Sequence, residues 1–148
     1  MSGVTFDRDE FGFPVVQVSG FPGFTSAFED SVSARRPKGI GGPSVSTYWV
    51  DLVLYRIEAN MSDDCGVELA SGNVTRLVAH GDRVRAESLY DLFDPEELPT
   101  DEVVELLRGY RSEIVRAAGS DEPQPFLKPP HEVWVAGTRD VEIRPDRR

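Results

Sequence analysis

The densest run of apolar side chains lies between Ser46 and Glu58 and reads STYWVDLVLYRIE. Apolar or aromatic residues fill both alternating sets of positions in this run, and many of them are β-branched or aromatic. Such residues fit a pleated surface, and a strand that is apolar on both sides is usually central and covered on both faces. The pattern therefore predicts a central strand over residues 46–58, with a sheet built around it.

Shorter alternating runs predict the strands that surround this centre. Val4–Phe6 and Val15–Val18 are separated by polar and turn-forming residues, which predicts a hairpin. A meander is predicted next, with a tight turn in which Gly81 adopts a positive φ. Its strands are Gly66–Ala70, Val74–Ala79 and Arg83–Glu87, and a terminal hairpin is predicted over residues 133–143.

One long helix is predicted over residues 100–118. Thr100 is a suitable capping residue, and Asp101 and Glu102 follow it where the helix dipole favours negative charge. Apolar residues then recur at intervals of three and four, which predicts a single buried stripe. They are Val103, Leu106, Leu107, Tyr110, Ile114 and Ala117. Gly109 interrupts the helix at a cost of about 1 kcal/mol relative to alanine, which fits a close approach to the sheet.

Two segments are predicted to connect these elements. Residues 20–44 are rich in Gly, Pro and Ser and predict a long loop with a short ordered piece near Phe24–Val32. Residues 120–131 contain four prolines and predict an extended connector. The 148 residues are expected to form one α+β domain, with an antiparallel sheet of six to eight strands and the helix packed on it.

Charge and cysteine content restrict the expected partners. The net charge of −10 and the pI near 4.6 argue against general affinity for nucleic acid or anionic lipid and favour a basic protein partner. The single cysteine, Cys65, excludes an internal disulfide and fits a reducing compartment. No start resembling a signal peptide and no membrane-spanning run is present, so a cytoplasmic protein is expected.

The acids are concentrated between Glu87 and Glu105, where eight carboxylates occur without any Lys or Arg. Tyr90, Leu92 and Phe93 are interleaved with them. Acidic groups that steer a basic partner, together with aromatic anchors, are typical of a protein-binding surface. The alternative is a solvated connector whose apolar residues dock on the core. The predicted contact residues are Glu87, Tyr90, Asp91, Phe93, Asp94, Glu96, Glu97 and Asp101.

The sequence offers no catalytic or metal-binding set. His80 and His131 are the only histidines, and neither lies in a recognised ligand spacing. Cys65 follows Asp63 and Asp64, whose charges would raise the pKa of a thiol and oppose its activation as a nucleophile. We therefore expect no catalytic residue, no metal and no cofactor.

A small-ligand site is the alternative that the sequence leaves open. Arg35, Arg36 and Lys38 precede a glycine-rich stretch whose composition suits phosphate, although the strand and helix that usually flank a phosphate loop are not predicted there. Asp51 lies within the apolar run and would need a partner if buried, and arginine is the partner expected. These four residues form the alternative ligand-binding set.

Three functions remain open on this basis. The first is a non-enzymatic acidic module that occludes a basic partner, of the immunity or antidote type that acts against a toxin such as a nuclease. The second is a small enzyme or ligand binder built on residues 35–42 with Asp51 or His80. The third is a structural subunit of a larger assembly, which an exposed apolar patch at Trp49, Phe126 or Trp134 would favour.

Overall fold

The computed structural model describes residues 3–38, 44–59 and 66–118. These residues contain six strands and three helices. In chain order they are β1 (Val4–Arg8), β2 (Pro14–Val18), α1 (Pro22–Ser31), α2 (Tyr48–Ala59), β3 (Val67–Ser71), β4 (Thr75–His80), β5 (Arg83–Ser88), β6 (Glu96–Pro99) and α3 (Thr100–Ala118). The predicted terminal hairpin, the proline-rich connector, Cys65 and His131 lie outside the described residues.

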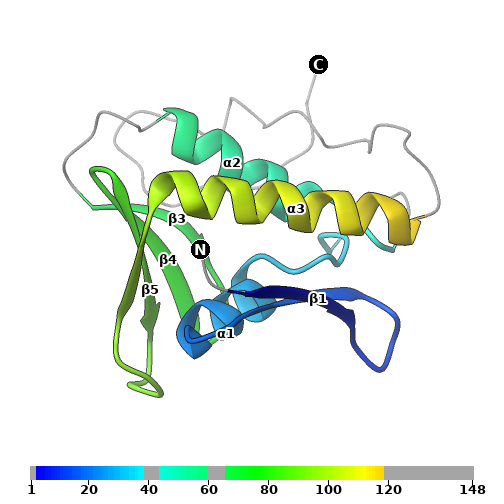
Figure 1. The fold of residues 1–148 in the computed structure, drawn as a ribbon, viewed down its shortest axis with the longest axis horizontal. Coiled ribbons are helices and arrows are strands. Elements are labelled where there is room, and N and C mark those ends of the chain that lie inside the picture. Colours follow the sequence, from blue (N-terminus) through cyan, green and yellow to red (C-terminus); the bar gives the residue numbers. More distant parts are fainter. Residues whose placement is uncertain (1–2, 39–43, 60–65, 119–148) are drawn as a thin grey trace.

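The strands form two separate antiparallel sheets. β1 and β2 pair as a hairpin, and β3, β4, β5 and β6 form a four-stranded meander in that order. Figure 1 shows α3 reaching from the four-stranded sheet at one end to the β1–β2 hairpin at the other, with α1 beneath it. The fold is α+β as predicted, but a single sheet of six to eight strands is wrong for the described part of the chain.

The predicted central strand is the main error, because most of residues 46–58 belong to helix α2. The buried positions include Tyr48, Leu52 and Arg56, which are spaced by four. A run that is apolar at almost every position fits a buried helix as well as a central strand. Thr47 precedes the helix and its carbonyl accepts the first intrahelical hydrogen bond, from the N–H of Asp51. The Ser46 hydroxyl accepts the N–H of Tyr48, and a Ser or Thr before an apolar run is a helix-start signal.

Two further elements replace predicted irregular structure. The ordered piece within residues 20–44 is a full helix, α1, which begins with Pro22 in its first turn, where the missing N–H costs nothing. Its buried residues Phe24, Ala27 and Phe28 pack against β2, β4 and β5. Strand β6 was not predicted, because only Leu98 among its four residues is a buried apolar side chain.

Other predictions are confirmed. The β1–β2 hairpin and the three-strand meander form where expected, and Gly81 has a φ of 57° at the β4–β5 turn. Helix α3 spans residues 100–118 with the predicted stripe buried from Val103 to Ile114. The side chain of Thr100 does not act as a cap, since its buried Oγ1 has no hydrogen-bond partner. Gly109 lies against β1, where an added Cβ would be 3.1 Å from Phe6 Cζ.

A cluster of hydrogen bonds ties the end of α1 to the start of β4. The Asp30 carboxylate accepts bonds from the backbone N–H groups of Asn73, Val74 and Thr75 and from the Thr75 hydroxyl, at 2.7–3.1 Å. Burial alone would raise the pKa of Asp30, but these hydrogen bonds together outweigh burial and lower the pKa below its ordinary value. The ionised carboxylate therefore contributes to the stability of the α1–sheet junction.

Two buried polar side chains, Tyr110 and Arg56, form hydrogen bonds that connect helices α3 and α2 to strands. The Tyr110 hydroxyl in α3 donates to the Pro14 carbonyl of β2 over 3.0 Å, and burial raises the pKa of Tyr110 well above its usual value. The Arg56 guanidinium in α2 donates to the Leu69 carbonyl over 2.7 Å, at the irregularity in the β3–β4 pairing. Burial lowers the pKa of Arg56, while Glu68 opposes this effect.

Candidate functional site

The loop between β5 and β6 carries the most prominent apolar surface. Tyr90 is 68% exposed, Leu92 66% and Leu89 41%. Among the described residues only Phe11, in the β1–β2 turn, is another exposed large apolar side chain. Three of four such side chains therefore occur within four consecutive positions. We call residues 89–94 the apolar tip.

Hydrogen bonds and a half-buried ring fix the backbone of the apolar tip. The Ser88 hydroxyl accepts bonds from the N–H groups of Tyr90 and Leu92, at 3.2 and 2.7 Å. Phe93 is half-buried against the core, next to Gly23 of α1. Phe93 was a predicted partner contact, but its ring faces the protein interior and anchors the tip. Tyr90 and Leu92 are held outward as a result.

Glu96, also a predicted contact residue, is engaged inside the protein. Its carboxylate accepts hydrogen bonds from the N–H groups of Gly23 at 2.8 Å and Phe24 at 2.9 Å. These N–H groups belong to the first turn of α1, where no residue of the helix itself supplies a side-chain cap. Glu96 therefore supplies from a distant strand the cap that the helix lacks.

Glu87 and Glu97 are neutralised on the outer face of the sheet. Arg76 Nε lies 2.6 Å from Glu87 and Arg83 Nε lies 3.3 Å from Glu97. Arg85 lies between the two acids, 3.7 Å from Glu87 and 3.9 Å from Glu97. Arginine and glutamate side chains thus face one another across β4, β5 and β6. The three arginines compensate the negative charge of the two acids on this face.

The other acids of the 87–105 stretch lie at two opposite ends of the β5–β6 pair. Arg83 pairs with Pro99 and Ala86 with Glu96, so the tip follows one end of this pair and α3 starts at the other. Asp91 and Asp94 flank the exposed tip side chains, whereas Asp101 is in the first turn of α3. No described residue forms an ion pair with these three carboxylates. The predicted contact surface is therefore divided in space.

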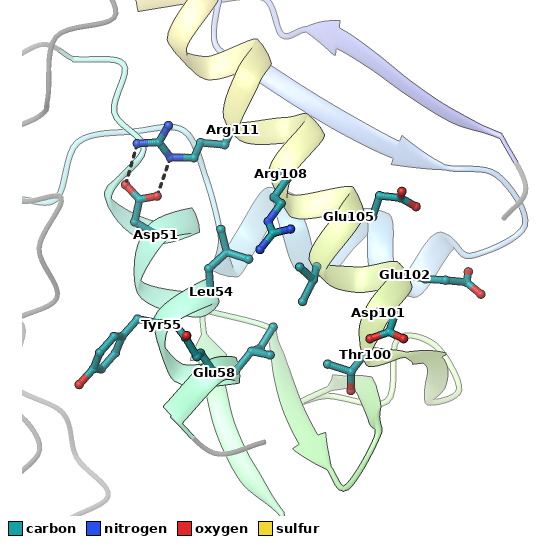
Figure 2. Close-up of a pocket in the computed structure, with 12 residues that line it drawn as sticks. Asp51, Leu54, Tyr55, Glu58, Thr100, Asp101, Glu102, Glu105, Arg108 and Arg111 are labelled. Atoms are coloured by element: carbon teal, nitrogen blue, oxygen red, sulfur yellow. Dashed lines mark hydrogen bonds and ion pairs between the residues drawn. The ribbon is translucent and has the colours of Figure 1, made fainter. Parts of the chain in front are cut away.

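A groove of about 950 Å³ runs between α2 and α3. Figure 2 shows side chains that line it, with Asp51 and Arg111 joined at one end, and with Glu58 of α2 facing Thr100 and Asp101 of α3 only across a gap at the other. Arg111 Nε donates to Asp51 Oδ1 over 2.7 Å, and the Thr47 hydroxyl donates to Asp51 Oδ2 over 2.8 Å. The expectation that a buried Asp51 takes an arginine partner is confirmed. Sequence reasoning did not identify Arg111 as that partner, since the two residues are 60 positions apart.

The basic residues of the alternative set do not join Asp51 in this groove. Arg35 lies 4.0 Å from the ring centroid of Phe13 and 5.7 Å from that of Phe11, and it pairs with Asp9 at 3.6 Å. Arg36 donates its backbone N–H to Ser44, and Lys38 is exposed. None of residues 35–38 lines the groove. Residues 39–43 lie outside the described residues.

Other features add no chemistry to these two surfaces. No group of three or more His, Cys, Asp or Glu side chains within residues 3–38, 44–59 and 66–118 is arranged to hold a metal ion. Within the same residues no helix combines the length and apolar character needed to span a bilayer. Trp49 is half-buried and packs edge-on against Tyr48, so it does not contribute to an exposed apolar patch.

Comparison of the chain with protein-family models finds no match, and comparisons with curated proteins and with solved structures find none either. The function must therefore be argued from the two surfaces themselves.

Proposed function

We propose that this protein is a non-enzymatic binding module that contacts a partner protein through the apolar tip. The observation that carries the proposal is the concentration of three exposed apolar side chains on a backbone held by Ser88 and Phe93. Exposing them costs free energy in water, and a partner that covers them recovers it. Because the tip is already ordered, little conformational entropy is lost on binding.

The chemistry of the tip favours a basic partner with an apolar pocket. Tyr90 and Leu92 are the anchors, and tyrosine is among the residues that most often dominate interface energies. Asp91 and Asp94 are exposed beside them, and the chain carries a net charge of −10. These charges accelerate the encounter with a positively charged surface. An antidote that occludes a basic cytoplasmic toxin such as a nuclease is the biological role that fits this combination.

The decisive experiment compares Tyr90 with Phe11, because the two aromatic side chains are equally exposed at 68% and 69% but lie in different loops. A photo-crosslinking phenylalanine derivative is placed at either position, and the protein is irradiated in lysate of its native cells. We expect one stoichiometric crosslinked protein from position 90 and none from position 11. The crosslinked protein is then purified and its affinity for the wild type measured.

Two variants test the anchors and the charges separately. The double substitution Tyr90→Ser with Leu92→Ser is expected to weaken binding at least about tenfold, since each anchor typically contributes 1 kcal/mol or more. Asp91→Asn with Asp94→Asn is expected to slow association and to reduce its salt dependence, with a smaller effect on dissociation. Phe11→Ser is the matched control and is expected to bind normally. Equal binding by all three variants would refute the proposal.

A further inference from the structure

The groove between α2 and α3 is a second surface, at the opposite end of the β5–β6 pair from the apolar tip. The two helices are antiparallel, because Asp51 near the start of α2 meets Arg111 in the later turns of α3. At the other end the groove is lined by Glu58, in the last turn of α2, and by Thr100 and Asp101 at the start of α3. The groove therefore follows α2 for about two turns and α3 for nearly three, or roughly 10–15 Å.

Each helix contributes residues at intervals of three and four to the groove. From α2 these are Asp51, Leu54, Tyr55 and Glu58, and from α3 they are Asp101, Val104, Glu105, Arg108 and Arg111, while Ile57, Thr100 and Glu102 also line it. The apolar lining residues are Leu54 and Val104, which are half-buried, and Ile57, which is buried; we call these three the floor of the groove. Two neighbouring helices that present such rows leave a depression into which the side-chain ridge of a third helix packs. A helix is therefore a better geometric match to the groove than an extended strand is.

Negative charges outnumber positive charges around the groove. Five carboxylates and two guanidinium groups line the groove. Asp51 and Arg111 neutralise each other, which leaves Arg108 as the only lining cation without an ion pair among the described residues. Figure 2 shows Arg108 extending toward the groove between the helices, while Glu58 on α2 and Asp101 on α3 lie on its two sides, toward the far end. An occupant with basic side chains at that end and apolar side chains over Leu54 and Val104 complements this pattern.

We propose that the α2–α3 groove binds a basic amphipathic helix of a partner protein. The apolar face of the helix covers Leu54 and Val104, and its lysine or arginine side chains pair with Glu58 and Asp101. This is the helix-in-groove mode of recognition, in which apolar anchors supply affinity and charges at the ends set orientation. The inference does not depend on the role proposed for the apolar tip, because the two surfaces share no residue.

The test uses two synthetic amphipathic helices of about 14 residues, one of leucine and lysine and one of leucine and glutamate, with fluorescence anisotropy on the full chain. We expect the leucine–lysine peptide to bind and the leucine–glutamate peptide not to bind. Glu58→Gln with Asp101→Asn is expected to weaken binding at least about tenfold. Arg108→Ala is expected to strengthen binding, since it removes a like charge from the groove.

The matched control is Asp91→Asn with Asp94→Asn, which changes the net charge by the same amount at the apolar tip. This variant is expected to bind the leucine–lysine peptide like the wild type. Equal weakening by the two double variants, or equal binding of both peptides, would overturn the inference. Val104→Asp places a charge on the floor, and its retained folding is checked by circular dichroism; undiminished binding by this folded variant would also overturn it.

Two other occupants would be revealed by the same material. Concentration-dependent dimerisation of the wild type that Val104→Asp abolishes would assign the groove to a second copy of the chain. Peptide binding that appears only after residues 119–148 are removed would assign it to that segment. Either result would overturn the proposal for the groove and leave the experiment on the apolar tip unaffected.

Discussion

Arg111 of α3 donates through Nε to Asp51 of α2 over 2.7 Å, and this pair joins the two helices that form the groove. The Asp51 side chain is 14% exposed and that of Arg111 35% exposed, so the pair is better shielded than an ordinary surface ion pair. We expect Asp51→Ala to lower the free energy of unfolding by about 1–2 kcal/mol, because it leaves a partly buried guanidinium without its acceptor.

A double-mutant cycle of Asp51→Asn and Arg111→Gln, followed by urea denaturation, measures this coupling. An interaction energy of about 0.5–1.5 kcal/mol is expected. Arg116 is the control, because it pairs with Glu113 but its side chain is 66% exposed. Arg116→Gln is expected to change stability by less than about 0.5 kcal/mol. A coupling of zero between Asp51 and Arg111 would show that the pair does not hold the helices together.

Glu96 is expected to be the most important acid of the 87–105 stretch for stability. Glu96→Ala removes the acceptor for the N–H groups of Gly23 and Phe24 and should cost about 1–2 kcal/mol, which is typical of a lost helix cap. Its neighbour Glu97 forms exposed ion pairs on the other face of β6. Glu97→Ala should cost less than about 0.5 kcal/mol. Thermal unfolding of the two variants side by side decides the matter, and equal losses would contradict the capping role.

Asp30 is expected to make stability depend on pH in the acidic range. Its pKa is lower in the folded protein than in the unfolded chain, where it is near 3.8. The contribution of the carboxylate is therefore complete above the unfolded value and is lost as the pH falls through the lower, folded value. Asp30→Asn should reduce stability by about 1–3 kcal/mol at neutral pH, because three backbone N–H groups and a hydroxyl lose a charged acceptor.

Urea denaturation of the wild type and Asp30→Asn between about pH 6 and pH 2 tests the sign of this effect. The difference between the two proteins should shrink as the pH falls below about 4. A difference that stays constant across this range would show that the ionised form of Asp30 is not the stabilising species.

Gly23 is expected to control the order of the apolar tip. A Cβ at this position would lie 2.7 Å from two ring carbons of Phe93 and 2.8 Å from the Glu96 carboxyl carbon. Gly23→Ala must therefore displace the ring or the carboxylate, at a cost of about 1–3 kcal/mol. Amide hydrogen exchange across residues 89–94 should become faster, since Phe93 anchors the tip. Ser26→Ala, on the same helix but half-exposed, is the control and should leave exchange unchanged.

The strands and the long helix could be predicted because their patterns are locally unambiguous. Helix α3 has a clear acidic start and one apolar stripe. The strands of the hairpins are runs of alternating apolar and polar residues that are bounded by turn residues. The prediction for residues 46–58 was wrong because apolar residues fill nearly every position of α2. The periodicity of the sequence therefore did not distinguish a helix from a strand. The Ser46-Thr47 pair and the length of the run were the signals that favoured a helix.

The candidate sites depend on contacts that no local pattern contains. Sequence reasoning found the acidic stretch, but it did not show that Glu87 and Glu97 meet arginines across the strands or that Glu96 caps α1. Sequence reasoning did predict Tyr90 as a contact residue. Leu92 was recognised only as an apolar residue between the acids and was not among the predicted contacts. The close spacing of apolar residues there, which fits neither helix nor strand, was the available sign of a loop with exposed side chains.

The long sequence separation of the polar contacts affects how the chain is completed during synthesis. Glu96 caps a helix that begins 74 positions earlier, at Pro22, and Tyr110 binds a carbonyl 96 positions earlier. While the ribosome is still adding residues between them, α1 lacks its cap and β2 lacks its hydroxyl donor. Domains fold as units during translation, and distant pairings form late. The elements of the N-terminal third therefore gain these polar contacts only after β6 and α3 have been synthesised.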